Sequence, residues 1–359
     1  MKFPYRKIVV KIGSNVITQD DGLPDHSRIK KITDQIAALK HKGIEVVLVS
    51  SGAVASGRSI IRVPEKQNAV AARQLLASIG QVKLINTYAA LFEAHEMTCA
   101  QVLVTKEDFR DRLHYLNMKN CLQILLQHKV VPIINENDVV SVTELMFTDN
   151  DELAGLVASM LGADALIILS NVNGIYTGDP KNPDSSLIEE ISGNAASIAG
   201  YVTTGKSQFG RGGMLTKASM AIKTASLGIP VHITNGKVDN VLPALLSGEL
   251  AHTRFVTGKN ASNKKKWIAH SEKAARGTVR VNDGARTALT SGRASSLLPV
   301  GVTAVLSSFQ KGDIIRVVDE EGQMIGLGIA EYGAEKAKER IGQKNQRPLV
   351  HYDYFYISN

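Results

Sequence analysis

Short apolar runs rich in Val and Ile alternate with helical patterns through the first 258 residues, and this alternation constrains the fold most strongly. It is typical of βαβ units, whose strands pair in parallel and are covered by helices on both faces. The predicted strands are Lys7–Ile12, Glu45–Val49, Thr98–Val104, Val130–Ile134, Ala165–Leu169 and Pro230–Ile233. We therefore predict a three-layer α/β/α sandwich with a mostly parallel, open sheet.

The pattern changes after about residue 253. A polar stretch with consecutive lysines at 264–266 precedes Trp267. From residue 277 onward, short apolar runs are separated by turn sequences that contain Gly, Asn and Asp, which is typical of a small β-rich domain. The predicted strands there are Thr278–Val281, Ile314–Val318 and Met324–Ile329. We predict an α/β domain over residues 1–258, a linker over 259–275 and a small β-barrel-like domain over 276–359.

Composition argues against several classes of protein. No stretch approaches the roughly 20 consecutive apolar residues that a membrane-spanning helix needs, and Lys11 interrupts the first apolar run too early for a signal peptide. The two cysteines, Cys99 and Cys121, fit neither a disulfide framework nor a zinc motif. We therefore expect a cytoplasmic protein with free thiols, no membrane segment and no metal-ligating residues of its own.

Small and polar residues follow four of the predicted strands. They are Lys11–Ser14, Ser50–Ala53, Asn135–Asp138 and Ser170–Gly174. In open α/β sheets, ligands bind outside the carboxyl ends of the strands. Gly13 and Gly52 would let backbone N–H groups approach a ligand closely, and the helices that follow present positive ends. One such segment alone is more often a plain turn, but four at one edge predict a site for an anion such as phosphate.

Two further segments fit a phosphate site. Gly210–Lys217 places a glycine-rich loop before a helix, with a lysine one turn in, although a flexible loop with a solvated lysine explains it equally well. Asp149–Glu152 opens another helix, where capping explains one acidic residue but not three. The spacing of a P-loop is absent from the sequence, which excludes P-loop kinases, and no G-x-G-x-x-G follows a strand, which disfavours a Rossmann dinucleotide site.

Together, these motifs resemble the amino acid kinase family, and within it the members that phosphorylate glutamate. The resemblance runs from about Ile8 to the C-terminus and rests on six ordered motifs. They are Lys11-x-Gly13-Ser14, Ser50-Ser51-Gly52-Ala53, Asn135-Glu136-Asn137-Asp138, Asp149-Asn150-Asp151, Gly174-Ile175-Tyr176-Thr177-x-Asp179-Pro180 and Gly212-Gly213-Met214-x-Thr216-Lys217. Segments near Trp267, Asn282, Pro299 and Gly312 are similar to a PUA domain. The resemblance implies an amino acid kinase fold followed by a PUA domain.

The resemblance also implies a reaction and its residues. The reaction is transfer of the γ-phosphoryl group of ATP to the side-chain carboxylate of L-glutamate, with Mg²⁺, as the first step of proline biosynthesis. Lys11 and Lys217 match charge-stabilising positions, and Asp151 matches the acid that orients them. The glutamate-binding positions are matched by Ser51, Gly52, Asp138 and Asn150. The ATP-binding positions are matched by Lys11, Gly13, Ser14, Ser170, Asn171, Arg211, Gly212, Gly213, Met214, Leu215, Thr216 and Lys217.

The residue types suit this chemistry. A carboxylate nucleophile is already ionised at neutral pH, so its phosphorylation needs no general base. Catalysis then consists of positioning and of neutralising the negative charge spread over the phosphoryl oxygens. Two lysines meet that need better than a His–Asp pair would, and the nine histidines show no catalytic spacing.

Two alternatives stay open, together with two expectations about partners. Other members of the family act on N-acetylglutamate, aspartate, carbamate or nucleoside monophosphates with a similar scaffold. A different class, an RNA-binding or RNA-modification protein, is suggested because PUA domains elsewhere bind RNA and residues 259–359 carry +6 of the net charge of +8. Such binding would depend strongly on salt. The resemblance further implies feedback inhibition by proline and a homo-oligomer, either a dimer or a tetramer.

Overall fold

The computed structural model describes residues 4–64, 68–141, 147, 149–192, 213–257, 263–269, 272, 275–291 and 294–358. The chain divides into two compact units. One contains residues up to 260 except 109–112, and the other contains residues 109–112 and 261–359. Each unit has its own hydrophobic core.

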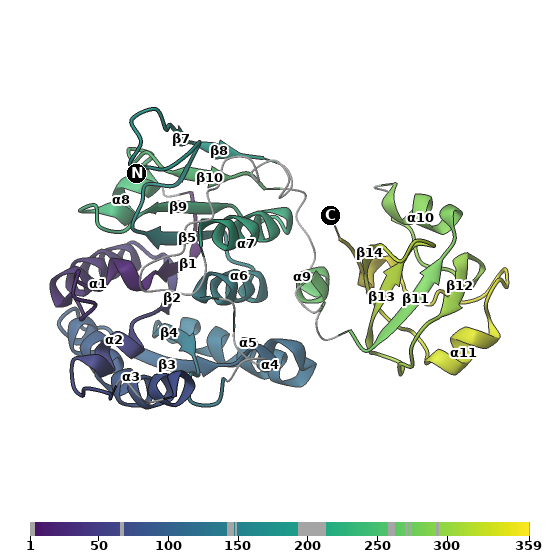
Figure 1. Cartoon of the computed structure of the whole chain (residues 1–359), viewed down its shortest axis with the longest axis horizontal. Helices are drawn as coiled ribbons and strands as arrows, with labels where there is room; N and C mark the ends of the chain where they lie inside the picture. Colours follow the sequence, from purple (N-terminus) through teal and green to yellow (C-terminus); the bar gives the residue numbers. More distant parts are fainter. Residues whose placement is uncertain are drawn as a thin grey trace. The chain divides into compact units, whose positions relative to one another are not determined.

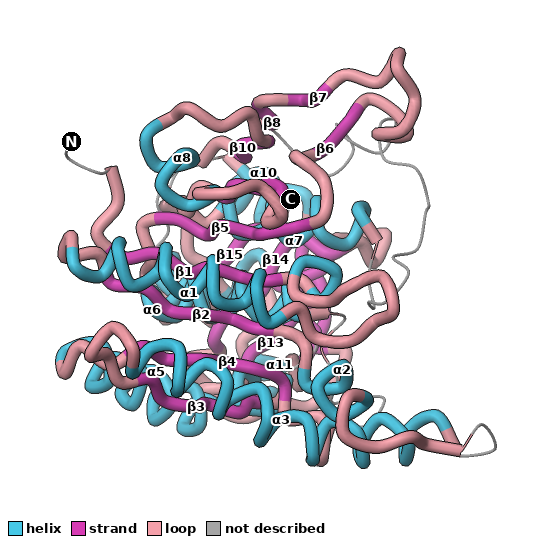
Figure 2. Tube along the Cα trace, turned by 90° about the vertical axis from the view of Figure 1, so that its left-hand side faces the viewer, coloured by secondary structure: helices cyan, strands magenta, loops and turns pink. Residues whose placement is uncertain are grey.

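The first unit is built on an eight-stranded sheet (Figures 1 and 2). Its strands, in spatial order, are β3 (Cys99–Val104), β4 (Val131–Glu136), β2 (Glu45–Ser50), β1 (Lys7–Ile12), β5 (Ala165–Ser170), β9 (Val231–Asn235), β10 (Thr253–Phe255) and β8 (Glu190–Ile191). The first six are parallel, whereas β10 runs antiparallel to β9. The prediction of a mostly parallel sheet is confirmed, and each of its six predicted strands is present within two residues of its predicted ends.

Helices cover both faces of this sheet (Figure 1). One face carries α1 (His26–His41), α3 (Ala69–Glu93) and α8 (Val241–Ser247), and the other carries α5 (Arg112–Gln127), α6 (Asn150–Leu161) and α7 (Met214–Ser226). Side chains alternate along a strand, so Val10 and Ile12 of β1 point into the core beneath α1. Lys11 lies between them and therefore faces α6.

Shorter elements complete the unit. They are the 3₁₀ turn η1 (Ser14–Val16), α2 (Ala53–Arg58) and the hairpin of β6 (Ile175–Tyr176) with β7 (Leu187–Ile188). Helix α4 (Lys106–Arg110) begins in this unit, and its last two residues belong to the second unit. Because η1 and α2 directly follow β1 and β2, they lie at the carboxyl edge of the sheet.

Helix α3 is long and apolar enough to cross a membrane by length and composition alone. Its Leu84, Tyr88 and Phe92 are buried in the core beneath the sheet, and Tyr88 donates to or accepts from the Ser50 hydroxyl at 2.8 Å. The helix is therefore a partly buried core helix of the first unit. Only three of its residues are charged, namely Arg73, Lys83 and Glu93.

The second unit contains a five-stranded sheet. Its order is β12 (Val302–Val305), β11 (Gly277–Val281), β13 (Ile314–Val318), β14 (Met324–Ile329) and β15 (Phe355–Ile357), with only β11 and β13 parallel. Helices α10 (Asp283–Thr290) and α11 (Ala334–Glu339) accompany it. The predicted small β domain is thus confirmed. Within the predicted linker, residues Asn263–Ala269 form α9, which belongs to this second unit.

Candidate active site

The carboxyl ends of the central strands bring the predicted site residues to one edge of the sheet. In the register of β1, Ile12 pairs with Ser50 of β2 on one side and with Leu169 of β5 on the other. The residues that follow these strands therefore start from neighbouring positions. Helix α6 begins at this same edge.

A buried carboxylate at the start of α6 joins the two predicted lysines. The Nζ of Lys11 lies 2.6 Å from Asp151 Oδ1, and the Nζ of Lys217 donates to Asp151 Oδ2. The side chains of Lys11 and Asp151 are almost fully buried, at 6% and 2% exposure. Asp149 caps the helix by accepting hydrogen bonds from the backbone N–H groups of Asp151 (2.9 Å) and Glu152 (3.0 Å). Capping by one acid and bridging by another explain the acidic start of α6.

The charges of this cluster influence one another strongly. Burial acts to raise the pKa of Asp151, but Lys11 and Lys217 outweigh it and hold that pKa well below its usual range. Burial also lowers the pKa of Lys11, and Asp151 opposes this shift. Burial together with the charge of Asp151 raises the pKa of Asp149 to about 6. Asp151 therefore stays ionised between the two lysine side chains.

Gly13 and Gly52, at this edge of the sheet, occupy positions where the backbone packs closely or has a positive φ. The N–H of Gly13 donates to the carbonyl of Leu169 at 3.1 Å, so this N–H is paired within the fold, and the predicted role of Gly13 in ligand binding stays a prediction. A Cβ at Gly13 would lie 3.2 Å from that carbonyl oxygen and 3.6 Å from Lys11 Nζ. Gly52 has a φ of +108° at the start of α2, and its Cβ would lie 2.8 Å from Ile17 Cδ1. Both positions therefore favour glycine.

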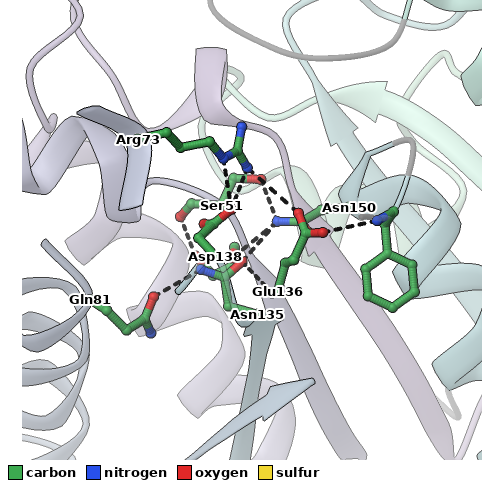
Figure 3. A network of polar contacts seen from close by, with 9 residues as sticks. Ser51, Arg73, Gln81, Asn135, Glu136, Asp138 and Asn150 are labelled. Carbon is green, nitrogen blue, oxygen red and sulfur yellow. Dashed lines mark hydrogen bonds and ion pairs between the residues drawn. The ribbon is translucent and has the colours of Figure 1, made fainter. Parts of the chain in front are cut away.

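A chain of amide hydrogen bonds connects two predicted glutamate-binding residues (Figure 3). The Nδ2 of Asn150 donates to Ser51 Oγ at 2.9 Å and to Asn135 Oδ1 at 3.0 Å. The Nδ2 of Asn135 in turn donates to Gln81 Oε1, on α3, at 2.9 Å. The backbone N–H of Glu136 donates to the same Asn135 Oδ1 at 2.9 Å, so Asn135 presents its oxygen to Asn150 and its NH₂ group to Gln81. Sequence reasoning missed Gln81.

The third predicted glutamate-binding side chain, Asp138, has a cationic partner that the sequence analysis also missed. Arg73 on α3 donates to Asp138 Oδ1 from Nε at 2.8 Å and from Nη2 (Figure 3). Nη2 also lies 3.6 Å from Glu136 Oε2, and Glu136 Oε1 accepts the backbone N–H of Phe147 at 2.9 Å. In the sequence, Arg73 is a single cationic residue near the start of an apolar helix. That pattern does not predict which carboxylate Arg73 contacts.

Glu136 should make the stability of the protein depend on pH. Burial, opposed by the Phe147 N–H and assisted by Asp138, raises the pKa of Glu136 to about 7. The folded chain thus keeps a proton that the unfolded chain releases near about pH 4.3. Stability from this proton is complete at low pH and is lost as pH rises through about 7. Relative to a Glu136→Gln variant, the wild type should lose unfolding free energy between about pH 5 and 7.5, in urea titrations.

The exposed Glu45 provides the matched control, because its replacement by Gln should leave the pH dependence of unfolding unchanged. Parallel curves for the wild type and Glu136→Gln would contradict the prediction.

The remaining predicted ATP-binding residues that the structure describes lie at or just after the ends of β1 and β5 or at the start of α7. Ser170 ends β5, and its carbonyl accepts the N–H of Gly236 at 2.8 Å, while Asn171 follows it in an exposed position. Ser14 opens η1. Gly213 caps α7, whose first turn contains Met214, Leu215, Thr216 and Lys217. Arg211 and Gly212 lie outside the described residues. The nucleotide-binding roles of all these residues stay predictions.

Comparisons with known proteins agree with this architecture. The sequence profile of the amino acid kinase family matches residues 6–235, and that of the PUA domain matches residues 277–351. The chain is 52% identical over 354 residues to the glutamate 5-kinase of Chlorobaculum tepidum, covering 98% of each chain. It is 50% identical over 360 residues to that of Bacteroides thetaiotaomicron, covering 99% of this chain and 100% of the relative.

Among solved structures, carbamate kinase from Giardia lamblia bound to AMP-PNP has a TM-score of 0.50 and 20% identity, covering 71% of this chain and 99% of that one. At that identity the likeness shows a shared fold. The chain therefore belongs to the amino acid kinase family, in its glutamate 5-kinase branch, and continues into a PUA domain.

Proposed function

We propose that this site transfers the γ-phosphoryl group of ATP to the side-chain carboxylate of L-glutamate, giving L-glutamyl 5-phosphate and ADP. This is the first step of proline biosynthesis. The observation that carries the proposal is the Lys11–Asp151–Lys217 cluster beside the Ser51–Asn150–Asn135 network at one sheet edge. Full-length similarity to glutamate 5-kinases supports the choice of glutamate over the substrates of other family members.

The chemistry follows from the charges. The glutamate carboxylate is ionised at neutral pH and attacks phosphorus without a general base. Lys11 and Lys217 neutralise the charge that spreads over the phosphoryl oxygens during transfer, and Asp151 keeps both ammonium groups aimed at one place. The Ser51 hydroxyl donates a hydrogen bond to the substrate, and Asn150 orients that hydroxyl. Gly52 forms the turn beside Ser51, and the carboxylate of Asp138 attracts the substrate ammonium.

The carboxylate oxygens of this site are suitable ligands for a Mg²⁺ ion. Such an ion is usually held by one or two carboxylates together with the phosphates of the nucleotide. No group of three or more His, Cys, Asp or Glu side chains able to hold a metal occurs among the described residues. Asp149 supplies a suitable oxygen, because its Oδ2 is buried and lacks a hydrogen-bond partner within the part of the chain that the structure describes. Magnesium bound to ATP would supply further neutralisation of phosphate charge.

The reaction can be tested by trapping its product. Purified protein is incubated with Mg-ATP, hydroxylamine and L-glutamate, with aspartate and N-acetylglutamate as control acids. A hydroxamate formed with glutamate alone is the expected result. A hydroxamate formed with another acid would show that the protein is a kinase of this fold with a substrate other than glutamate. No hydroxamate from folded protein would contradict kinase activity and favour the RNA-binding alternative, which a salt titration of RNA binding then tests directly.

The PUA domain is proposed to serve assembly or regulation and not the chemistry. All predicted site residues lie at or before Lys217, in the first unit. A chain of residues 1–257 should therefore fold and retain glutamate-dependent ATP turnover within about threefold of the full chain. Circular dichroism and the hydroxamate assay check the two parts of this prediction. A shortened chain that folds but makes no hydroxamate would show that the second unit is required.

The remaining proposals concern assembly, regulation and place of action. A homo-oligomer, dimer or tetramer, is supported by an exposed apolar surface formed by Ile60 beside α2 and by Leu75 and Val82 on α3, which are 50%, 43% and 60% exposed. Sedimentation of the wild type and of Val82→Glu tests that surface.

Proline is the proposed feedback inhibitor, tested in the hydroxamate assay. The proposed compartment is the cytoplasm, which suits the free thiols of Cys99 and Cys121.

A further inference from the structure

The substrate side of the site holds one cation that the mechanism above does not use. Arg73 contacts Asp138 Oδ1 through Nε (2.8 Å) and Nη2, and Nη2 lies 3.6 Å from Glu136 Oε2. The side chain of Arg73 is 32% exposed, whereas those of Asp138 and Glu136 are 8% and 5% exposed. The guanidinium group therefore covers two buried carboxyl groups on their solvent side.

The hydrogen-bonding capacity of Arg73 is only partly used. Both of its contacts with Asp138 go to a single oxygen, unlike the two-pronged pairing in which arginine engages both oxygens of a carboxylate. Among the described residues, no side chain or backbone group accepts a hydrogen bond from Nη1, which points away from the carboxyl groups in Figure 3. Two N–H groups thus remain for an anion that approaches from solvent.

An α-amino acid matches this arrangement of charges. Its ammonium and its carboxylate are attached to one carbon, so the protein groups that bind them must carry opposite charges and lie close together. Asp138 and Arg73 are in direct contact, and they adjoin the network of Ser51 and Asn150 (Figure 3). We propose that Arg73 binds the α-carboxylate of the substrate while Asp138 binds its α-ammonium. This inference rests on the proposed function and deepens it.

Arg73 has a second effect on the same ligand. Burial raises the pKa of Asp138, and the charge of Arg73 opposes that shift. Loss of Arg73 would therefore favour the protonated form of Asp138, which attracts an ammonium group poorly. Alkaline pH favours the ionised form of Asp138 with or without Arg73, so measurement there reduces this indirect effect relative to the direct contact with the α-carboxylate.

The consequence is selectivity for a free amino acid. A ligand whose α-carboxylate is an amide keeps the ammonium and the side-chain carboxylate but has no charge for Arg73. L-Isoglutamine is such a ligand. A peptide that begins with glutamate has the same defect, so the site discriminates against glutamyl side chains in peptides.

The experiment uses the full chain at about pH 8.5, which favours the ionised form of Asp138. The KM for L-glutamate and the competitive inhibition constant of L-isoglutamine are measured for the wild type, Arg73→Gln and Arg73→Lys. In the wild type, isoglutamine should bind about 30-fold or more weaker than glutamate. Arg73→Gln should raise the KM for glutamate until the two constants agree within about threefold, and Arg73→Lys should restore part of the difference.

Arg28 on α1 is the matched control, because it also forms an ion pair, with Asp239 at 3.4 Å, but lies outside the site. Arg28→Gln should leave both constants unchanged. Equal weakening of glutamate and isoglutamine by Arg73→Gln would overturn the proposal and reduce Arg73 to a support for Asp138, as would no weakening of either. A wild type that forms no glutamyl hydroxamate would overturn the proposed function instead, so the two failures are distinguishable.

Discussion

Replacing Lys217 by alanine is expected to lower kcat by about 10³-fold while changing the KM for L-glutamate by less than about threefold. The ammonium group of Lys217 is held by Asp151 at the start of α6, whereas glutamate is proposed to bind at the neighbouring Ser51–Asn150 network. Its charge matters most when negative charge spreads over the transferring phosphoryl group. An interaction made mainly in that state lowers kcat when it is removed and leaves substrate binding nearly intact.

Steady-state rates of ADP release at saturating ATP measure both constants. Lys223, in the last turn of the same helix, supplies the control, since Lys223→Ala removes a lysine from α7 at a distance from Asp151. Its kcat should equal that of the wild type. A normal kcat for Lys217→Ala, or a loss confined to KM, would remove Lys217 from the proposed transfer step.

Replacing Asp151 by asparagine should produce the largest loss of stability, about 3–5 kcal/mol. The variant keeps the shape of the side chain but removes the buried negative charge that pairs directly with both Lys11 and Lys217. Asp151 has a depressed pKa, so its contribution is present at neutral pH and is lost only as pH falls below the usual range of a carboxyl group. The difference between wild type and variant should therefore shrink only in acid.

Urea unfolding at pH values from about 7 down to 3 measures this difference. Asp239 provides a matched control, because it too has two cationic partners, Arg28 and Lys31, but is well exposed. Asp239→Asn should leave the unfolding midpoint nearly unchanged, since exposed ion pairs contribute little. Equal midpoints for Asp151→Asn and Asp239→Asn would contradict the view that Asp151 neutralises a buried pair of charges.

The residues at the carboxyl edge of the sheet could be predicted from the sequence, because strand positions and side-chain alternation depend on short stretches of sequence. A parallel βαβ pattern places residues that follow different strands at one edge, and alternation along β1 sends Lys11 to the face opposite Val10. These two rules already bring Lys11 toward the start of α6, where the structure pairs it with Asp151. For Lys217 the residue pattern left a solvated lysine equally open, and only the resemblance to the family assigned it to the site.

The residues of α3 escaped prediction for the opposite reason. Arg73 and Gln81 reach Asp138 and Asn135 only because the helix packs against β4 and the turn after it, and that packing depends on the whole core. The short strands β8 and β10 were also missed, because two or three residues give no apolar run to detect. Gly13 shows a third limit, since a glycine that permits close packing of backbone resembles one that exposes an N–H.

Helix α3 contacts the proposed substrate site on one side and carries exposed apolar residues on the other. On one side Arg73, Gln74 and Gln81 hold Asp138, the carbonyl of Val139 and Asn135. On the other side Leu75 and Val82 lie exposed. A second subunit bound to the exposed side of α3 that displaced the helix would move Arg73, Gln74 and Gln81 together. Affinity for the amino acid should then depend on protein concentration across the range in which subunits associate.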